Sequence, residues 1–214
     1  MNDSLAPFSV EVARPEHVQE LAALFARTGS TCFCRYWHFA GDKNAWLDRC
    51  ANRATDSRSE MEQALGRATD QMRGVVAIHQ RVIGWMKLAP AESLRKLYDQ
   101  RLYRGLPCFQ GDRAGVFTIG CFLVDEAWRR RGVAHALLDA GIAAARSWGA
   151  RAIEAFPRRS ELASAEELWT GAAGLFTKAG FAEVHDFAPY PVFRLNLTEK
   201  SGARAGCCFE PIAR

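Results

Sequence analysis

The sequence lacks the features of a membrane-spanning or secreted chain. Even the apolar run from Gly132 to Ala145 contains His135 and Asp139, so we expect no segment to cross a bilayer. The opening residues, MNDSLAPFSVEV, do not place a positively charged segment before an apolar one, as a secretory signal would. The sequence therefore predicts a cytoplasmic protein with no membrane role.

The sequence also lacks a disulfide framework and a strong charge of one sign. Its 7 cysteines are an odd number spread unevenly along 214 residues, which favours a reducing compartment. With 28 Lys and Arg against 24 Asp and Glu, the formal charge of +4 is too small to indicate a nucleic-acid partner. A hydrophobic fraction of 49% and a charged fraction of 24% are typical of a globular domain and argue against a disordered, collagen-like or coiled-coil chain.

Neither an internal repeat nor a clear linker divides the chain. We therefore expect one α+β domain with a mixed sheet over residues 1–198, followed by a tail over residues 199–214. Apolar periodicity and turn residues predict the order of the elements. The expected strands are Phe8–Ala13, Gly74–Ile78, Val82–Leu88, Val116–Val124, Ala152–Phe156, Phe181–Phe187 and Val192–Leu197; the expected helices are one from Pro15 that Gly29 stops, then Ala45–Arg53, Ser57–Arg67, Ser93–Tyr98, Val133–Trp148 and Glu166–Lys178.

Two local features refine this outline. Ser57 and Glu60 form a capping-box pattern, which predicts that the third helix begins there. The long connection from Ala91 to Gly115 is unusual for a loop inside a domain, so we expect it to carry local structure or to cover a site.

The most informative feature is a basic turn between an apolar strand and a helix. Val116–Val124 is apolar on both faces, as an internal strand is, and Arg129–Gly132 leads into the helix that begins at Val133. The first amide groups of a helix have no partner within it and carry partial positive charge, so this turn is suited to an anion such as a pyrophosphate. The small residues Gly132 and Ala134 permit close approach of the backbone.

The alternative is that Arg129, Arg130 and Arg131 are merely solvated. Three consecutive cations beside the positive end of a helix repel one another and the helix dipole, however. A bound anion would offset that cost and would use the guanidinium donors. We therefore expect an anion site at this turn.

At these residues the sequence resembles the GCN5-related N-acetyltransferase (GNAT) superfamily. Its signature Q/R-x-x-G-x-G/A is matched by Arg129–Ala134, within the segment FLVDEAWRRRGVAHALL. Further along, LFTKAGF at Leu175–Phe181 is similar to the end of the family's next helix. The resemblance covers residues 8–197 and implies a mixed, mostly antiparallel central sheet, splayed into a V and flanked by helices on both faces.

The resemblance implies that acetyl-CoA is the cosubstrate and that its acetyl group passes directly to a primary amine of a small molecule or peptide. Strand backbone would pair with the pantetheine arm, and helix-turn amides would hold the pyrophosphate. Relatives often form dimers, so a homodimer is a further expectation, whereas no nucleic-acid partner is expected. The predicted cofactor-binding residues are Phe122, Leu123, Val124, Arg129, Arg130, Arg131, Gly132, Val133, Ala134 and His135.

The sequence departs from the family at the residues expected to move protons. Phe176 stands where relatives often carry a tyrosine acid, and phenylalanine cannot donate a proton. The strand before the basic turn also lacks the glutamate that many relatives use as a base. Glu154 is our first candidate for the base, because a carboxylate in the apolar run AIEAF is either paired or functional, although a solvent-facing position stays open. The other candidates are Cys121, His185 and Tyr190.

The segment TCFCRYWHFA, residues 31–40, is dense in cysteines and aromatic residues. Cys32, Cys34, His38 and Cys50 are all metal-ligand types, but their spacing is not that of the usual structural zinc sites, so we predict no metal. In the family that the sequence resembles, the variable region between the first two helices forms the acceptor-side wall of the cleft, so the resemblance implies that role for this segment, with core packing as the alternative. Trp169 either flanks the acceptor or packs in the core. The predicted acceptor-binding residues are Cys32, Tyr36, Trp37 and Trp169.

Two rival functions remain at this point. Phe176 and the missing glutamate suggest an acyl-CoA-binding sensor that has lost catalysis. The arginine run suggests a nucleic-acid protein, which would show salt-sensitive affinity for DNA or RNA.

Overall fold

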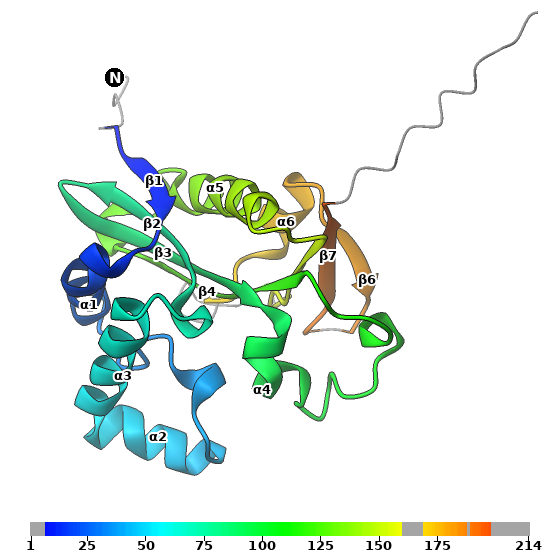
Figure 1. The fold of residues 1–214 in the computed structure, drawn as a ribbon, viewed down its shortest axis with the longest axis horizontal. Coiled ribbons are helices and arrows are strands. Elements are labelled where there is room, and N and C mark those ends of the chain that lie inside the picture. The colour runs from blue at the N-terminus through cyan, green and yellow to red at the C-terminus, as the bar shows by residue number, and fades with distance from the viewer. Residues whose placement is uncertain (1–6, 160–168, 188, 198–214) are drawn as a thin grey trace, which may run out of the picture.

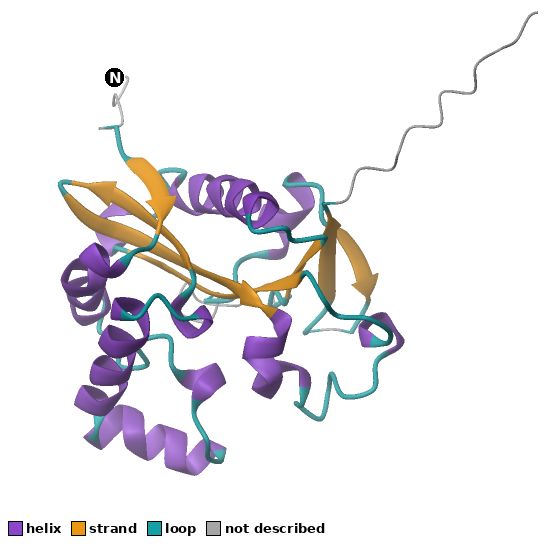
Figure 2. Ribbon diagram, viewed as in Figure 1, coloured by secondary structure: helices purple, strands orange, loops and turns teal. Residues whose placement is uncertain are grey.

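The computed structural model describes residues 7–159, 169–187 and 189–197. These residues form a seven-stranded sheet in the order β1-β2-β3-β4-β5-β7-β6, with helices on both faces (Figures 1 and 2). Only the pairing of β4 with β5 is parallel. The predicted α+β fold with a mostly antiparallel central sheet is therefore confirmed.

The observed elements follow the predicted order. The strands are β1 (Ser9–Val12), β2 (Gly74–His79), β3 (Arg81–Pro90), β4 (Val116–Val124), β5 (Ala152–Ala155), β6 (Ala182–His185) and β7 (Val192–Asn196). The α-helices are α1 (Val18–Arg27), α2 (Lys43–Asn52), α3 (Ala54–Gly66), α4 (Arg95–Tyr98), α5 (Val133–Ser147) and α6 (Ala173–Lys178). The connection after β3 carries α4 and the short 3-10 helices η4 (Ala91–Leu94) and η5 (Pro107–Phe109), as expected for so long a segment.

Helix α5 covers one face of the sheet because two glycines let it approach closely (Figure 1). A Cβ at Gly84 on β3 would lie 2.8 Å from Val133, and one at Gly141 on α5 would lie 2.1 Å from Met86. The apolar stripe of α5, with Leu137 as a fully buried member, thus packs directly onto β2 and β3. This contact fixes the position of the helix start, where the anion site is predicted.

Helices α1 and α3 cover the opposite face around the fully buried Trp85 (Figure 1). Here the predicted capping box is wrong. The third helix begins at Ala54, one turn earlier, and Ser57 is fully buried within it, where its hydroxyl accepts a hydrogen bond from Arg49 at 3.0 Å. Glu60 pairs with Arg49 and Arg35 rather than with a helix cap.

Two predicted boundaries, the start of the last helix and the start of the tail, lie in residues that the structure does not describe. The helix predicted over Glu166–Lys178 is observed as α6 from Ala173, and residues 160–168 lie outside the described residues. The predicted tail, 199–214, also lies outside them, so the single-domain boundary at residue 198 stays a prediction. No helix among the described residues is long and apolar enough to span a bilayer.

The sheet opens between β4 and β5. Strand β4 pairs with β3 from Phe117 to Val124, but it pairs with β5 only over Val116–Thr118. Beyond Thr118, the edge of β4 that faces β5 is no longer paired with that strand. Gly120 is the extra residue of a bulge in β4 at this point, since Ile119 and Cys121 oppose consecutive residues of β3. The splayed V that the resemblance implied is thus the gap between these two strands.

Candidate cofactor and acceptor site

The turn between β4 and α5 is held in place by a buried carboxylate. Asp125 caps the 3-10 helix η6 (Glu126–Trp128) by accepting a hydrogen bond from the Ala127 amide at 3.2 Å. Its carboxylate also pairs with Arg27 at 3.2 Å and Arg81 at 3.4 Å. These contacts tie the turn to α1 and β3, so the loop that follows starts from a fixed point.

The loop backbone turns sharply into the helix. Arg130 has φ +60° and Gly132 has φ +81°, so both adopt the left-handed conformation, which is unusual for an arginine. Gly132 is the N-cap of α5, and no side chain caps the first turn. The first amides of the helix therefore have no side-chain cap and carry partial positive charge, as an anion site requires.

A groove of about 580 Å³ runs from this helix start along the open edge of β4. It is bounded by the end of α1, by Phe122–Val124, by the arginine turn and by the segment Trp169–Ala172; we call it the cofactor groove. A smaller hollow over Gly132 and Val133 continues it. Of the predicted cofactor-binding residues, Phe122, Leu123, Val124, Arg129, Arg130, Ala134 and His135 line the groove, and Gly132 and Val133 line its continuation.

Arg131 is placed differently from its neighbours. Its guanidinium lies 5.6 Å from the centre of the Trp128 ring, and it lines neither hollow. Arg129 instead donates to the carbonyl of Val124 at 3.4 Å, which keeps its head beside the β4 edge. The geometry therefore assigns the groove to Arg129 and Arg130 and leaves Arg131 at its margin.

The open edge of β4 is partly occupied by the protein itself. The amide of Phe122, predicted to pair with the pantetheine arm, donates a hydrogen bond to the Trp169 carbonyl at 2.6 Å. Gly171, with φ +91°, lets this segment pass close to the core, since a Cβ there would lie 2.7 Å from the Phe176 ring. The segment around Trp169 thus bridges the V of the sheet.

Glu154 is surrounded by donors. Its carboxylate accepts two hydrogen bonds from Arg113, at 2.8 and 2.7 Å, two from Arg194, at 3.1 and 2.5 Å, and one from the Tyr98 hydroxyl at 2.6 Å. Burial would raise the pKa of the carboxyl, but the hydrogen bonds from Arg113 and Tyr98 hold it below its ordinary value. This geometry argues against the predicted role of Glu154 as a base and corrects the solvent-facing alternative, because the residue is fully buried.

Cys121 lies in a buried cluster with Cys34 and Lys87 beneath the bulge of β4. Hydrogen bonding to Cys34 and burial raise the pKa of the Cys121 thiol well above its ordinary value. Burial opposes ionisation of Cys34 as well, but hydrogen bonds from Cys121 and Trp85 and the Lys87 charge lower its pKa to about 6. A thiol that keeps its proton is a poor base, so the structure argues against Cys121 in that role too.

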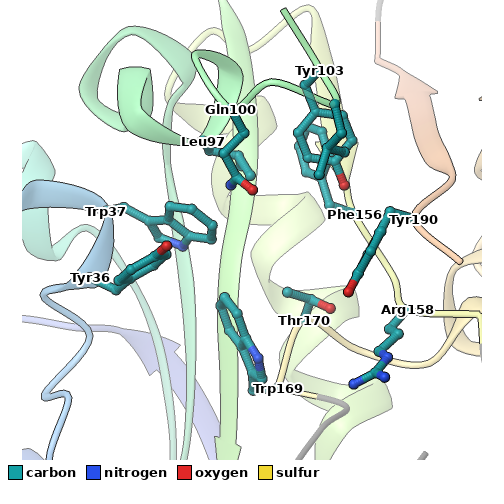
Figure 3. A pocket seen from close by; sticks show the side chains of 11 residues that line it. Tyr36, Trp37, Leu97, Gln100, Tyr103, Phe156, Arg158, Trp169, Thr170 and Tyr190 are labelled. Atoms are coloured by element: carbon teal, nitrogen blue, oxygen red, sulfur yellow. The ribbon is translucent and has the colours of Figure 1, made fainter. Parts of the chain in front are cut away.

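The predicted acceptor-side residues meet around Trp169. Its ring centre lies 5.6 Å from that of Trp37, and Trp37 donates through its indole nitrogen to the Gly120 carbonyl at 3.0 Å. Tyr36, Trp37 and Trp169 line a cavity of about 400 Å³, which we call the aromatic cavity (Figure 3). Tyr36, Cys32 and Trp169 also line a neighbouring hollow, the second cavity, together with Cys121 and Phe122.

The far wall of the aromatic cavity comes from residues that the sequence analysis missed or assigned otherwise. Figure 3 shows Tyr103, Phe156 and Tyr190 facing the two tryptophans across it. Tyr103 follows α4 and Phe156 follows β5, 53 positions apart, so no local spacing connects them. The density of aromatic residues in each segment is the only sequence signal that could have indicated a shared wall.

Comparison with known proteins identifies the family of this chain. The sequence profile of the acetyltransferase (GNAT) family matches residues 36–181. The chain belongs to this family. No protein of curated function matches the sequence at a significant level.

Solved structures resemble the GNAT chain along nearly its whole length. The GCN5-related N-acetyltransferase from Kribbella flavida is 20% identical, with a TM-score of 0.52 over 89% of this chain and 98% of its own. The yncA protein from Salmonella typhimurium, solved with its cofactor acetyl-CoA, is 16% identical, with a TM-score of 0.52 over 92% and 98%. The PaiA N-acetyltransferase from Thermoplasma acidophilum, in complex with coenzyme A, is 10% identical, with a TM-score of 0.51 over 88% and 99%. At these identities the likeness shows the fold.

Phe176 belongs to the hydrophobic core of this GNAT chain. Phe176 is fully buried, and its ring packs against Phe122, Phe181 and Phe193, so the position serves the core.

Among the described residues, no group of three or more metal-ligand side chains is placed to hold a metal ion. His38 is one member of the set considered for zinc; burial and the charge of Lys87 lower its pKa to about 3.

Proposed function

We propose that this GNAT protein is an acetyl-CoA-dependent N-acyltransferase that acts on a primary amine of a small molecule or peptide. The observation that carries the proposal is the uncapped start of α5, with Arg129 and Arg130, at the end of a groove that follows the open edge of β4. A cofactor with a pyrophosphate at one end and an extended arm at the other matches this arrangement. The yncA and PaiA structures, described with acetyl-CoA and coenzyme A, support the same cosubstrate.

Different residues of the cofactor groove bind different parts of acetyl-CoA. Amides of the first α5 turn and the guanidinium groups of Arg129 and Arg130 hold the pyrophosphate. Leu123 and Val124 present backbone to the pantetheine arm, and the Phe122 amide becomes available when the Trp169 carbonyl moves from it. When bound, acetyl-CoA supplies an activated thioester at the end of the groove near the β4 bulge.

The acceptor amine enters from the aromatic cavity, which adjoins the groove at Trp169. A protonated primary amine must lose one proton before its nitrogen attacks the thioester carbonyl, and a second proton as the C–N bond forms and the C–S bond breaks. Tyr190 remains from the predicted bases as the one that lines this cavity, and the Thr170 hydroxyl lines it too. We propose that these hydroxyls pass both amine protons to water, and that coenzyme A leaves as a thiolate which takes a proton from solvent.

A thiol-release assay tests this function. The protein is incubated with acetyl-CoA and a panel of primary amines, and free coenzyme A is followed together with the mass of the acetylated product. We expect amine-dependent thiol release and a higher melting temperature in the presence of acetyl-CoA. Absence of thiol release with every amine would contradict the acyltransferase proposal, and absence of stabilisation by acetyl-CoA would contradict the proposed cosubstrate.

The same assay separates the rivals. An acyl-CoA sensor would be stabilised by acetyl-CoA but would release no thiol with any amine. A nucleic-acid protein would instead be stabilised by DNA or RNA, with an affinity that falls steeply with salt.

A further inference from the structure

We propose that the acceptor is a primary amine carried on an aromatic or similarly flat apolar body, and that the aromatic cavity selects it. This inference rests on the proposed function, because it names the class of amine that the same site acetylates. It is carried by two observations: two facing walls of aromatic rings, and the place of the cavity beside the cofactor groove, with which it shares Trp169.

One wall is made of the two tryptophans. Trp37 is buried, and its indole hydrogen bond to Gly120 fixes it against the bulge of β4. Trp169 is 40% exposed, and its ring packs against that of Trp37 with the two planes tilted by 35°. A flat ligand on this wall would cover apolar surface that water now contacts.

The opposite wall is also aromatic. Tyr103 and Phe156 pack edge-to-face with ring centres 4.9 Å apart, and both are buried. Burial and the neighbouring Tyr190 raise the pKa of the Tyr103 hydroxyl, so this wall stays neutral. Figure 3 shows Tyr190 below Phe156, with its hydroxyl end directed toward Thr170. Rings at both walls favour an aromatic ligand, since offset and edge-to-face ring pairs stabilise beyond simple burial.

The walls of the cavity disfavour a polycationic acceptor. Among the described lining residues the large side chains are mostly aromatic rings, and Glu154 on β5 is already paired with Arg113 and Arg194. A polyamine would bring further hydrated ammonium groups against these ring surfaces, which is costly. A single amine directed at the thioester, with an apolar body behind it, avoids that cost.

The experiment compares primary amines that differ in shape or charge. Steady-state kcat/KM is measured for 2-phenylethylamine, hexylamine and spermidine with saturating acetyl-CoA. We expect 2-phenylethylamine to exceed hexylamine about tenfold, the effect of a few ring–ring contacts, and spermidine to be the poorest. The binding of 2-phenylethylamine and spermidine to the protein loaded with coenzyme A, which has no acetyl group to transfer, is measured by calorimetry as well.

Variants then assign the preference to the cavity. Trp169→Leu and Phe156→Leu keep an apolar side chain but remove a ring, and each should lower the ratio of kcat/KM for 2-phenylethylamine to that for hexylamine at least threefold. The ratio cancels any change in acetyl-CoA affinity. Phe187→Leu is the matched control, since it also replaces a ring by leucine, at a residue that is 47% exposed and outside the lining of the aromatic cavity; its ratio should stay unchanged.

The outcomes separate the inference from the function on which it rests. Turnover of hexylamine or spermidine equal to that of 2-phenylethylamine would overturn the inference and leave the acyltransferase assignment intact. Failure of 2-phenylethylamine to bind the loaded protein would overturn it too, with or without turnover of other amines. A protein that neither binds acetyl-CoA nor releases thiol would contradict the proposed function itself.

Discussion

Two groups of arginines in this molecule differ in the source of their counter-charge. Arg113 and Arg194 close on the fully buried carboxylate of Glu154 through paired hydrogen bonds. Arg129 and Arg130 stand at the positive end of α5, and in the described part of the chain neither forms an ion pair with a carboxylate. The first group is complete within the fold, whereas the second is arranged for an anion from outside.

The comparison explains why the most conspicuous carboxylate in the sequence is a poor candidate for catalysis. Once buried between two guanidinium groups, Glu154 is held ionised, and its carboxylate oxygens accept hydrogen bonds that stabilise the fold. The basic turn differs, because Arg129 and Arg130 lie beside the positive end of the helix without a carboxylate partner among the described residues. Their repulsion lowers the stability of the fold, and a bound anion would relieve it. Stability and ligand binding should therefore depend on different arginine groups.

The largest expected effect separates the two groups through stability. Glu154→Gln should lower the free energy of unfolding by about 3–5 kcal/mol, since it leaves Arg113 and Arg194 without their buried counter-charge. Chemical denaturation measures this loss. Asp186→Asn is the control, because that carboxylate is 73% exposed where it pairs with Arg159 and should cost less than about 1 kcal/mol. Equal losses in both variants would contradict the structural role of Glu154.

The next effect addresses the basic turn through affinity. Gly132→Glu should weaken acetyl-CoA binding at least about 100-fold, because it places bulk and negative charge where the pyrophosphate is held. A Cβ at Gly132 meets no atom within 4 Å, but the φ of +81° strains any other residue. Gly132→Ala reproduces the strain without the charge and should retain most of the affinity. Calorimetric titration of both variants distinguishes charge from strain, and unchanged affinity in Gly132→Glu would refute the pyrophosphate site.

A smaller effect is expected from single arginines of the turn. Arg130→Gln should reduce acetyl-CoA affinity about five- to tenfold, as loss of one charge-assisted contact does, with a weaker salt dependence than the wild type. Arg58→Gln, which removes an exposed arginine paired with Glu62 on α3, serves as the control and should bind normally. If both variants bind acetyl-CoA with equal affinity, Arg130 has no part in the groove.

The smallest effect concerns acid stability. Because the pKa of Glu154 is lowered in the folded protein, its stabilising contribution is full above the unfolded value, about 4.3, and is lost as pH falls through the folded value. The difference in unfolding free energy between wild type and Glu154→Gln should therefore narrow below about pH 4. Denaturation curves at pH 3 and pH 7 measure it. A difference that widens in acid would contradict the ion pair.

The local features of the sequence predicted the anion-binding side well. The bounds of β4 and the start of α5 at Val133 follow from an apolar run and a glycine-containing turn, both contained within 18 residues. The predicted strands and helices correspond to observed elements, with shifts at their ends. Such elements are readable because their signals are periodic and near one another in the chain.

The remaining features depend on contacts between distant residues. Glu154 reads as a candidate base until Arg113 and Arg194, about 40 positions away on either side, fold onto it. The aromatic cavity likewise joins η2 (Tyr36–His38), the segment after α4 and the end of β5. Phe176 looked like a missing catalytic residue, but its role is set by the rings of Phe122, Phe181 and Phe193. No spacing rule within the sequence reports these partners.

One measurement tests the central claim most directly. Dissociation constants are determined for acetyl-CoA and for S-acetylpantetheine, which lacks the pyrophosphate and nucleotide, with the wild type and with the double variant Arg129→Gln/Arg130→Gln. We predict that the wild type prefers acetyl-CoA at least about 100-fold and that the double variant loses about tenfold or more of that preference, because only the longer ligand reaches the turn. The same preference in both proteins would contradict the account.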